Sequence, residues 1–162
     1  MGAHYQLWSI LALAALVAGC RSEPTAPLPE PVTELGPAIV TDRSSYDWTL
    51  YHEARWVVRN PHGVAVYFVF PSDYVYLQRY DGGAWRDLPT WYGWALDQRL
   101  VHQVPAGDSL EGVMPLTNDV VPVSGWHRLA FLIYKDSSGA LLWPLGNRVT
   151  PAVWIGPARG GA

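Results

Sequence analysis

The sequence predicts an all-β fold, a two-sheet antiparallel β-sandwich built from residues 38–157. Several windows alternate apolar and polar residues with a period of two, and none shows a convincing helical period. Turn signals recur about every 8–12 residues, as they do in sandwiches. The chain has 162 residues, of which 49% are hydrophobic and 15% charged, so it can bury the core of one domain. Periodicity leaves a closed barrel open as the alternative.

The first strands flank a turn at residues 60–63. Residues 48–59 alternate, with apolar Trp56 and Val58 at even positions and charged Glu53 and Arg55 at odd positions. This pattern predicts a strand with one buried and one solvated face. Pro and Gly then mark the turn, and the continuous apolar run 64–70 predicts a central strand.

The middle of the domain predicts a hairpin. Residues 74–80 alternate, Asp81-Gly82-Gly83 can adopt the positive φ of a tight turn, and residues 84–88 return. Further strands are expected over 99–104, 110–116, 126–135, 140–143 and 148–155, and no helix is expected.

The N-terminal residues predict an export signal. Residues 7–18 form an apolar run that is too short to span a bilayer but has the length of a signal-peptide core. It ends in Leu16-Val17-Ala18-Gly19-Cys20, and Cys20 is the only cysteine, which excludes an intramolecular disulfide.

This ending resembles the signal of bacterial lipoproteins. The resemblance implies cleavage of the signal peptide, residues 1–19, and lipidation of Cys20 by diacylglycerol and an acyl chain such as palmitate. This lipid anchor would then hold the protein at the cell membrane, on the extracytoplasmic side. Arg21 implies the outer membrane in a two-membrane bacterium. An ordinary signal peptide, or a buried helix with a core cysteine, are the alternatives.

Residues 20–37 are expected to form a tether. Five prolines lie between residues 23 and 37, which favours extended polyproline II and a spacer role. The domain would follow over 38–157, with a tail at 158–162.

The body also resembles a bacterial immunoglobulin-like domain. The matching features are turn and core residues in a fixed order: Asn60, Gly83-Ala84-Trp85 with Leu88-Pro89, Pro105-Ala106-Gly107-Asp108-Ser109, and Gly125-Trp126-His127-Arg128-Leu129. His127 stands where the family usually has Tyr. The resemblance implies an immunoglobulin-like sandwich and no catalytic activity.

No residue pattern predicts catalysis, a cofactor or a metal site. The four histidines that follow the signal stand far apart, although zinc bound across strands is an alternative. The acidic residues near the hairpin lack the alternating acidic loop that binds calcium. Nothing in the sequence marks two carboxylates as a glycosidase-like pair. The residues considered are His52, His62, His102, His127, Asp81, Asp87, Asp97, Glu53, Asp73 and Glu111.

An aromatic connection at residues 90–94 is the candidate binding site. Trp91, Tyr92 and Trp94 can stack on sugar rings or anchor a protein partner. The alternative is that they plug one end of the sandwich.

We therefore expect a monomeric, lipid-anchored, non-catalytic module with a protein-interaction or structural role in the bacterial envelope. The alternative is a carbohydrate or cell-wall binding module that uses Trp91, Tyr92 and Trp94. Nucleic acid is excluded as a partner because 14 acidic residues outnumber 11 basic ones.

Overall fold

The computed structural model describes residues 25–69, 75–88, 101–117, 120–121 and 123–157, and they form an all-β fold. This confirms the all-β class that the sequence predicts. The described residues contain no helix long and apolar enough to cross a bilayer. The strands are β1 Ala38–Thr41, β2 Ser45–Tyr46, β3 Glu53–Arg59, β4 Val66–Val69, β5 Val75–Asp81, β6 Ala84–Asp87, β7 Val101–Val104, β8 Ser109–Pro115, β9 Gly125–Phe131 and β10 Val153–Ile155.

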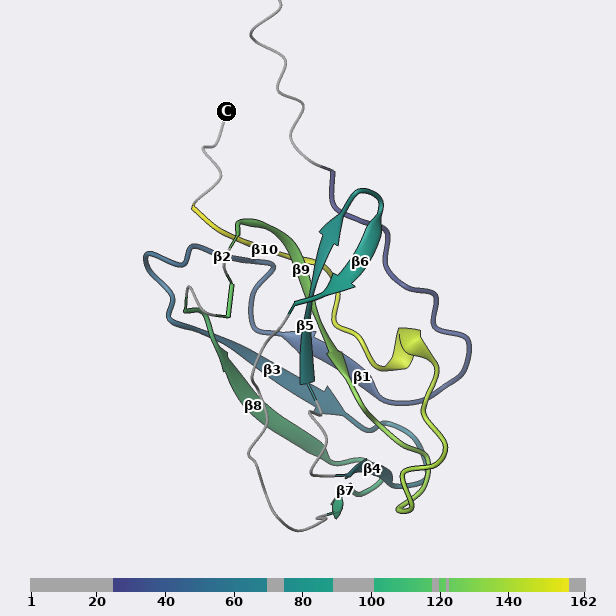
Figure 1. Ribbon diagram of the computed structural model, residues 1–162. Coiled ribbons are helices and arrows are strands. Elements are labelled where there is room, and N and C mark those ends of the chain that lie inside the picture. The colour runs from purple at the N-terminus through teal and green to yellow at the C-terminus, as the bar shows by residue number, and fades with distance from the viewer. Residues whose placement is uncertain (1–24, 70–74, 89–100, 118–119, 122, 158–162) are drawn as a thin grey trace, which may run out of the picture.

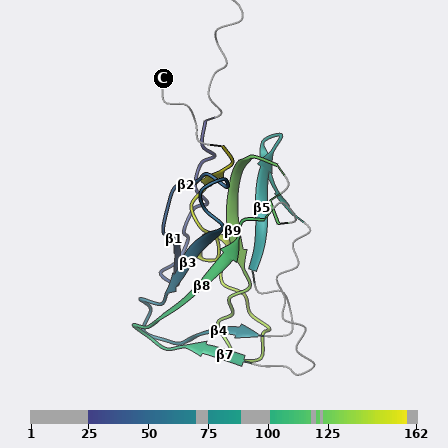
Figure 2. The same ribbon diagram turned by 90° about the vertical axis from the view of Figure 1, so that its left-hand side faces the viewer.

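The strands form two main sheets that face each other. Sheet A has the order β1-β3-β8 and sheet B the order β2-β10-β9-β5-β6, while β4 and β7 form a separate pair. Neighbouring strands are antiparallel except β10 and β2, which are parallel. Figure 1 shows the strands of sheet B in front, and Figure 2 shows the two layers with β4 and β7 across one end. The arrangement is that of a β-sandwich.

The core lies between the two sheets, on the faces that the alternation predicted. In β3, Ala54, Trp56 and Val58 are buried, and the charged residues between them are exposed. Trp56 packs edge-on against Phe131 of β9, with ring centroids 5.0 Å apart. Because one ring comes from each sheet, this pair joins the two layers.

The strand predicted over 48–59 begins only at Glu53. The residues before Glu53 form a turn instead, because the Asp47 carboxylate accepts a hydrogen bond from the Thr49 amide at 2.9 Å. Its carbonyl oxygen accepts the amides of Leu50 and Tyr51 at 2.9 and 2.8 Å. Side-chain and carbonyl acceptors of Asp compete with strand formation in this way, and a turn results.

The C-terminal strands are also shorter than predicted. Of 148–155 only β10, Val153–Ile155, is a strand, and residues 140–143 contribute only an isolated bridge between Tyr134 and Leu142. A 3₁₀ turn, η1, spans Leu145–Asn147 where no helical turn was predicted. The sequence did not predict β1 and β2, which have four and two residues and pair with β3 and β10.

Asn60 joins two of the motifs that the sequence singled out. Its side-chain Nδ2 donates hydrogen bonds to the carbonyls of Val64, Val104 and Pro105 at 2.9–3.0 Å. Its backbone carbonyl accepts the Gly107 amide at 2.8 Å. The Asn-containing turn and the turn at 105–109 therefore form one hydrogen-bonded unit.

Part of the expected tether lies on the domain. We call residues 29–37 the strap. Arg128 of β9 binds Glu30 of the strap at 2.8 Å, and Lys135 forms an ion pair with Glu34. Asn147 Nδ2 donates to the carbonyls of Glu34 and Pro37 at 3.2 and 3.3 Å. Extended backbone leaves its carbonyls unpaired, so they are available to these donors. Any free spacer therefore ends before the strap.

Candidate functional site

The binding and modification residues predicted from the sequence lie outside the described part of the chain. Cys20 belongs to residues 1–24, and Trp91, Tyr92 and Trp94 belong to residues 89–100. Lipidation and the aromatic loop therefore stay predictions.

The four histidines lie at separate places. His102 is an exposed residue of β7 and His62 lies in the predicted turn, whereas His52 lies in a bend before β3 and not in a strand. His127 is fully buried in β9, and its Nδ1 lies 2.9 Å from the Gly125 carbonyl. No cluster of three or more His, Cys, Asp or Glu side chains occurs among the residues that the structure describes.

The carboxylates considered from the sequence do not gather in one place among the residues that the structure describes. Glu53 forms an exposed ion pair with Arg55 at 3.1 Å, and Asp87 accepts a hydrogen bond from Gln78 at 2.7 Å. Asp81 and Glu111 are exposed on β5 and β8. Asp73 and Asp97 lie outside the described residues.

Four aromatic side chains cross the outer face of sheet B and form a site that the sequence analysis missed. We call Trp154, Trp126, Tyr80 and Trp85 the outer aromatic row. Trp154 pairs with Trp126 across β10 and β9, and Tyr80 pairs with Trp85 across β5 and β6. The pairing of Gln78 with Arg128 places the two pairs next to each other on one face. All four side chains are half-buried.

The rings in each pair of this row are steeply inclined. The centroids of Trp126 and Trp154 are 5.6 Å apart with planes at 80°, and those of Tyr80 and Trp85 are 5.2 Å apart at 62°. Edge-to-face packing of this kind is favourable for aromatic pairs. At most one ring of each pair can therefore lie flat on the sheet.

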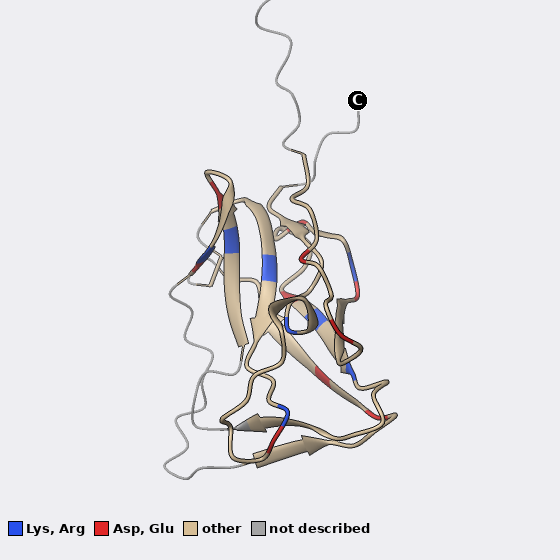
Figure 3. Ribbon diagram, turned by 90° about the vertical axis from the view of Figure 1, so that its right-hand side faces the viewer, with Lys and Arg blue, Asp and Glu red and all other residues tan. Residues whose placement is uncertain are grey.

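Arg128 lies beside this row in a socket formed by three side chains. Its Nε donates to Gln78 at 2.6 Å, its Nη1 binds Glu30 of the strap at 2.8 Å, and its guanidinium stacks on the Trp85 ring at 4.3 Å. The side chain is only 4% exposed. Figure 3 marks the Lys and Arg positions along the ribbon in blue. A buried guanidinium needs such partners, and here the strap supplies the charge.

A cleft of about 620 Å³ opens at the β2 edge of the same sheet. Its walls include Arg43, Asp47, Tyr51 and Trp154, so Trp154 belongs both to the cleft and to the outer aromatic row. The cleft and the row therefore form one continuous surface.

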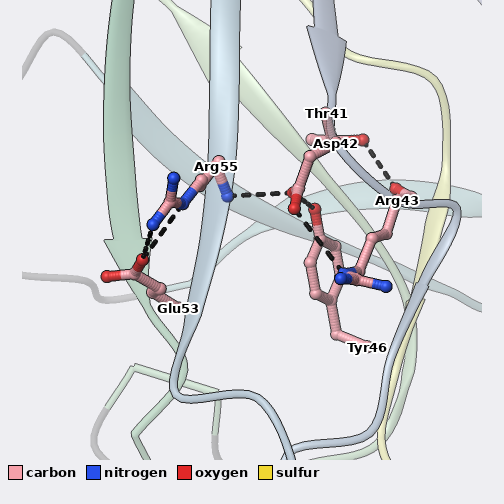
Figure 4. A network of polar contacts seen from close by, with 6 residues as sticks. All are labelled: Thr41, Asp42, Arg43, Tyr46, Glu53 and Arg55. Carbon is pink, nitrogen blue, oxygen red and sulfur yellow. Dashed lines mark hydrogen bonds and ion pairs between the residues drawn. The ribbon is translucent and has the colours of Figure 1, made fainter.

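Asp42 fixes one wall of this cleft (Figure 4). It accepts hydrogen bonds from the Tyr46 hydroxyl and, at 3.1 Å, from the Arg55 amide, and Arg43 lies 3.6 Å away. Burial raises the pKa of the Tyr46 hydroxyl above its usual range, and the Asp42 carboxylate raises it further. Tyr46 is therefore a neutral donor at neutral pH, and it positions the Asp42 carboxylate.

Comparison with known proteins yields no family. No protein-family model matches the chain, and no curated protein matches it. Two crystal structures of a β-glucosidase from Listeria innocua, in complex with glucose and with gluconolactone, share 16% identity with it. The matched region covers 74% of this chain and 16% of the β-glucosidase chain, with TM-scores of 0.33 and 0.32. The chain thus spans about a sixth of that protein's length.

Proposed function

We propose that this protein is a lipid-anchored, extracytoplasmic, immunoglobulin-like module that binds a protein partner in the bacterial envelope without catalysis. The outer aromatic row and the adjoining cleft carry this proposal. Trp, Tyr and Arg are the residue types that dominate protein interfaces, and here they gather on one half-exposed sheet face. A continuous aromatic surface with nearby polar groups suits such a partner.

The ring geometry favours a protein over a glycan at this face. Sugars stack on rings that lie flat, and the inclined pairs offer at most one flat ring each. A protein side chain can use ring edges as well as faces. The carbohydrate alternative rests instead on Trp91, Tyr92 and Trp94.

The strap limits the distance between the domain and a membrane to which Cys20 would be attached. Pro29 lies nine positions after Cys20 in the sequence, and a fully extended chain over nine positions reaches about 30 Å. A domain held by its strap would therefore stay close to a lipid on Cys20. A side surface of the domain, such as the outer aromatic row, would then face neighbouring envelope proteins.

Labelling with an alkyne analogue of palmitate tests the anchor. The full chain should incorporate the label and sediment with membranes, and Cys20→Ala should lose both properties. Equal labelling of the two proteins would refute lipidation at Cys20.

Site-specific photocrosslinking tests the protein-binding face. A photoreactive phenylalanine analogue at position 80, in the outer aromatic row, should give one discrete adduct in intact cells. The same probe at Val113, exposed on sheet A, is the control and should not give that adduct. The same adduct from both positions, or none from position 80, would contradict the proposal.

Co-sedimentation with purified cell-wall sacculi tests the glycan alternative. Binding by the parent chain that is lost in the Trp91→Ala/Trp94→Ala double variant would replace the protein-binding proposal. Absence of sedimentation with sacculi would reject the carbohydrate alternative.

A further inference from the structure

The apolar inner face of sheet B ends in a row of three polar side chains. Across β5 and β9, Val75 faces Phe131 and Leu77 faces Leu129, and all four are buried. The next pair in this register is Arg79 with His127. Arg86 of β6 lies directly opposite Arg79 and extends the row. Across β9, β5 and β6 the order is therefore His127, Arg79, Arg86.

The two arginines form an unfavourable pair as they stand. Directly opposed residues on antiparallel strands have their Cβ atoms about 5 Å apart, and like charges in that position destabilise the sheet. Neither Arg79 nor Arg86 takes part in any ion pair within the described part of the chain. The nearest acid along the strand, Asp81, is exposed and forms no such pair either.

Two buried nitrogen atoms in this row lack a hydrogen-bond partner. They are Arg79 Nε and His127 Nε2, and the His127 side chain is fully buried. A buried donor or acceptor without a partner destabilises the fold, because it has lost its hydrogen bonds to water. Arg79 Nε lies against the start of β9, since a Cβ on Gly125 would be 3.4 Å from it. Burial, and then the charge of Arg79, lower the pKa of His127 to about 4, so the imidazole is neutral at pH 7.

The hydrogen bond of His127 decides what its free nitrogen can do. A carbonyl oxygen only accepts, so Nδ1 carries the proton and donates to Gly125. In the neutral ring, Nε2 is then an acceptor. The row therefore presents two guanidinium donors and one acceptor, and its end at Arg86 is exposed to solvent.

We infer that Arg79, Arg86 and His127 bind a phosphate-type oxyanion that carries one proton. The anionic oxygens would accept hydrogen bonds from both guanidinium groups, which removes their mutual repulsion. The P–OH group would donate to His127 Nε2. Hydrogen phosphate carries this proton, and a phosphate monoester carries it in its monoanionic form. Sulfate and phosphodiesters lack the proton and fit it less well.

Calorimetry with inorganic phosphate tests the site on the complete chain in detergent at pH 7. Saturable binding is expected, and Arg86→Gln should weaken it about tenfold or more, because hydrogen bonds to charged groups contribute about 1.5–3 kcal/mol. Arg59→Gln is the matched control, since Arg59 is also an exposed strand arginine outside the described ion pairs. It should bind phosphate like the parent. Both substitutions are at exposed positions, and equal thermal midpoints would show that both variants fold.

The choice of anion tests the role of His127 and the source of the phosphate. Sulfate should bind at least about tenfold more weakly than phosphate. Glycerol 3-phosphate should compete with phosphate, whereas vesicles of phosphatidylglycerol, a phosphodiester, should not. Failure to bind phosphate, equal loss in both arginine variants, equal affinity for sulfate, or competition by the vesicles would each overturn the inference. None of these results bears on the outer face of the sheet, where the proposed partner would bind.

Discussion

Glu30 and Arg128 lie 98 residues apart in the sequence and form a 2.8 Å ion pair. Arg128 is almost fully buried, and Glu30 comes from the strap, outside the two sheets. The same guanidinium stacks on Trp85 of the outer aromatic row. One interaction therefore attaches the strap to the domain and orders the edge of the proposed binding face.

Replacing Glu30 should destabilise the protein through Arg128. Glu30→Ala leaves a buried guanidinium without its counter-charge, so we expect a loss of about 1–3 kcal/mol in the free energy of unfolding. Urea denaturation followed by tryptophan fluorescence measures it. Glu53→Ala is the control, because its ion pair with Arg55 is exposed and should contribute less than about 0.5 kcal/mol. Equal losses in the two variants would mean that the strap pair is no stronger than a surface pair.

The sequence predicted the strands best where they are long enough to show a two-residue alternation of apolar and polar residues. β3 and β5 have seven residues each and overlap the predicted strands 48–59 and 74–80, and the buried face of β3 is the one that the alternation indicated. β2, with two residues, owes its place to pairing with β10. The turn at Asp47 and the 3₁₀ turn at Leu145–Asn147 depend on local hydrogen bonds that periodicity does not report.

The candidate sites depend on contacts that the sequence alone does not place. Trp126 and Trp154 share a face only because of the β9–β10 register, which no local pattern fixes. Likewise, the proline content predicted a segment without helix or strand, as the structure shows for residues 25–37, but the prediction of a spacer did not include the ion pair of Glu30 with Arg128. Tertiary contacts between distant residues decide both features.

The close approach of Trp56 to Gly112 gives a second prediction. The two residues face each other across β3 and β8, and a Cβ on Gly112 would lie 2.1 Å from the indole Cζ2. Trp56 is buried and packs on Phe131, so it has little room to move. Gly112→Ala should reduce stability by about 1–3 kcal/mol.

Thermal unfolding of Gly112→Ala beside Gly63→Ala checks this. No atom lies within 4 Å of a Cβ built on Gly63, and its φ is not positive. The Gly63 variant should therefore unfold near the parent midpoint or slightly above it. An unchanged midpoint in the Gly112 variant would show that the indole moves aside freely.

The amide of Asn60 gives a third prediction. It is buried and donates to three backbone carbonyls, which Asn60→Ala would leave without this donor. We expect a loss of about 2–4 kcal/mol in the free energy of unfolding. Asn60→Asp keeps the oxygen that accepts the His62 amide but sets a carboxylate against the three carbonyls.

The two Asn60 variants should respond differently to pH. Burial beside carbonyls raises the pKa of a carboxyl group, so the Asp variant should be less stable than the Ala variant at pH 7 and recover part of the difference at pH 4. Urea denaturation at both pH values measures this. A constant difference between the variants would mean that the carboxylate does not face the carbonyls.

His127 should make the fold sensitive to acid. Burial, followed by the charge of Arg79, lowers its pKa from 6.5 to about 4 in the folded protein. The unfolded chain therefore binds the proton first as the pH falls. The contribution of the neutral imidazole to stability is complete above about pH 6.5 and is lost progressively down to about pH 4. A shift of this size corresponds to about 3 kcal/mol.

Urea denaturation at pH 7 and pH 4 isolates this effect by comparing two histidine variants. His127→Gln removes the buried ionisable group, so its free energy of unfolding should fall about 3 kcal/mol less than that of the parent over this range. His102→Gln replaces an exposed histidine of β7 and is the matched control. The same fall in the parent and in both variants would mean that the pKa of His127 does not differ between the folded and the unfolded chain.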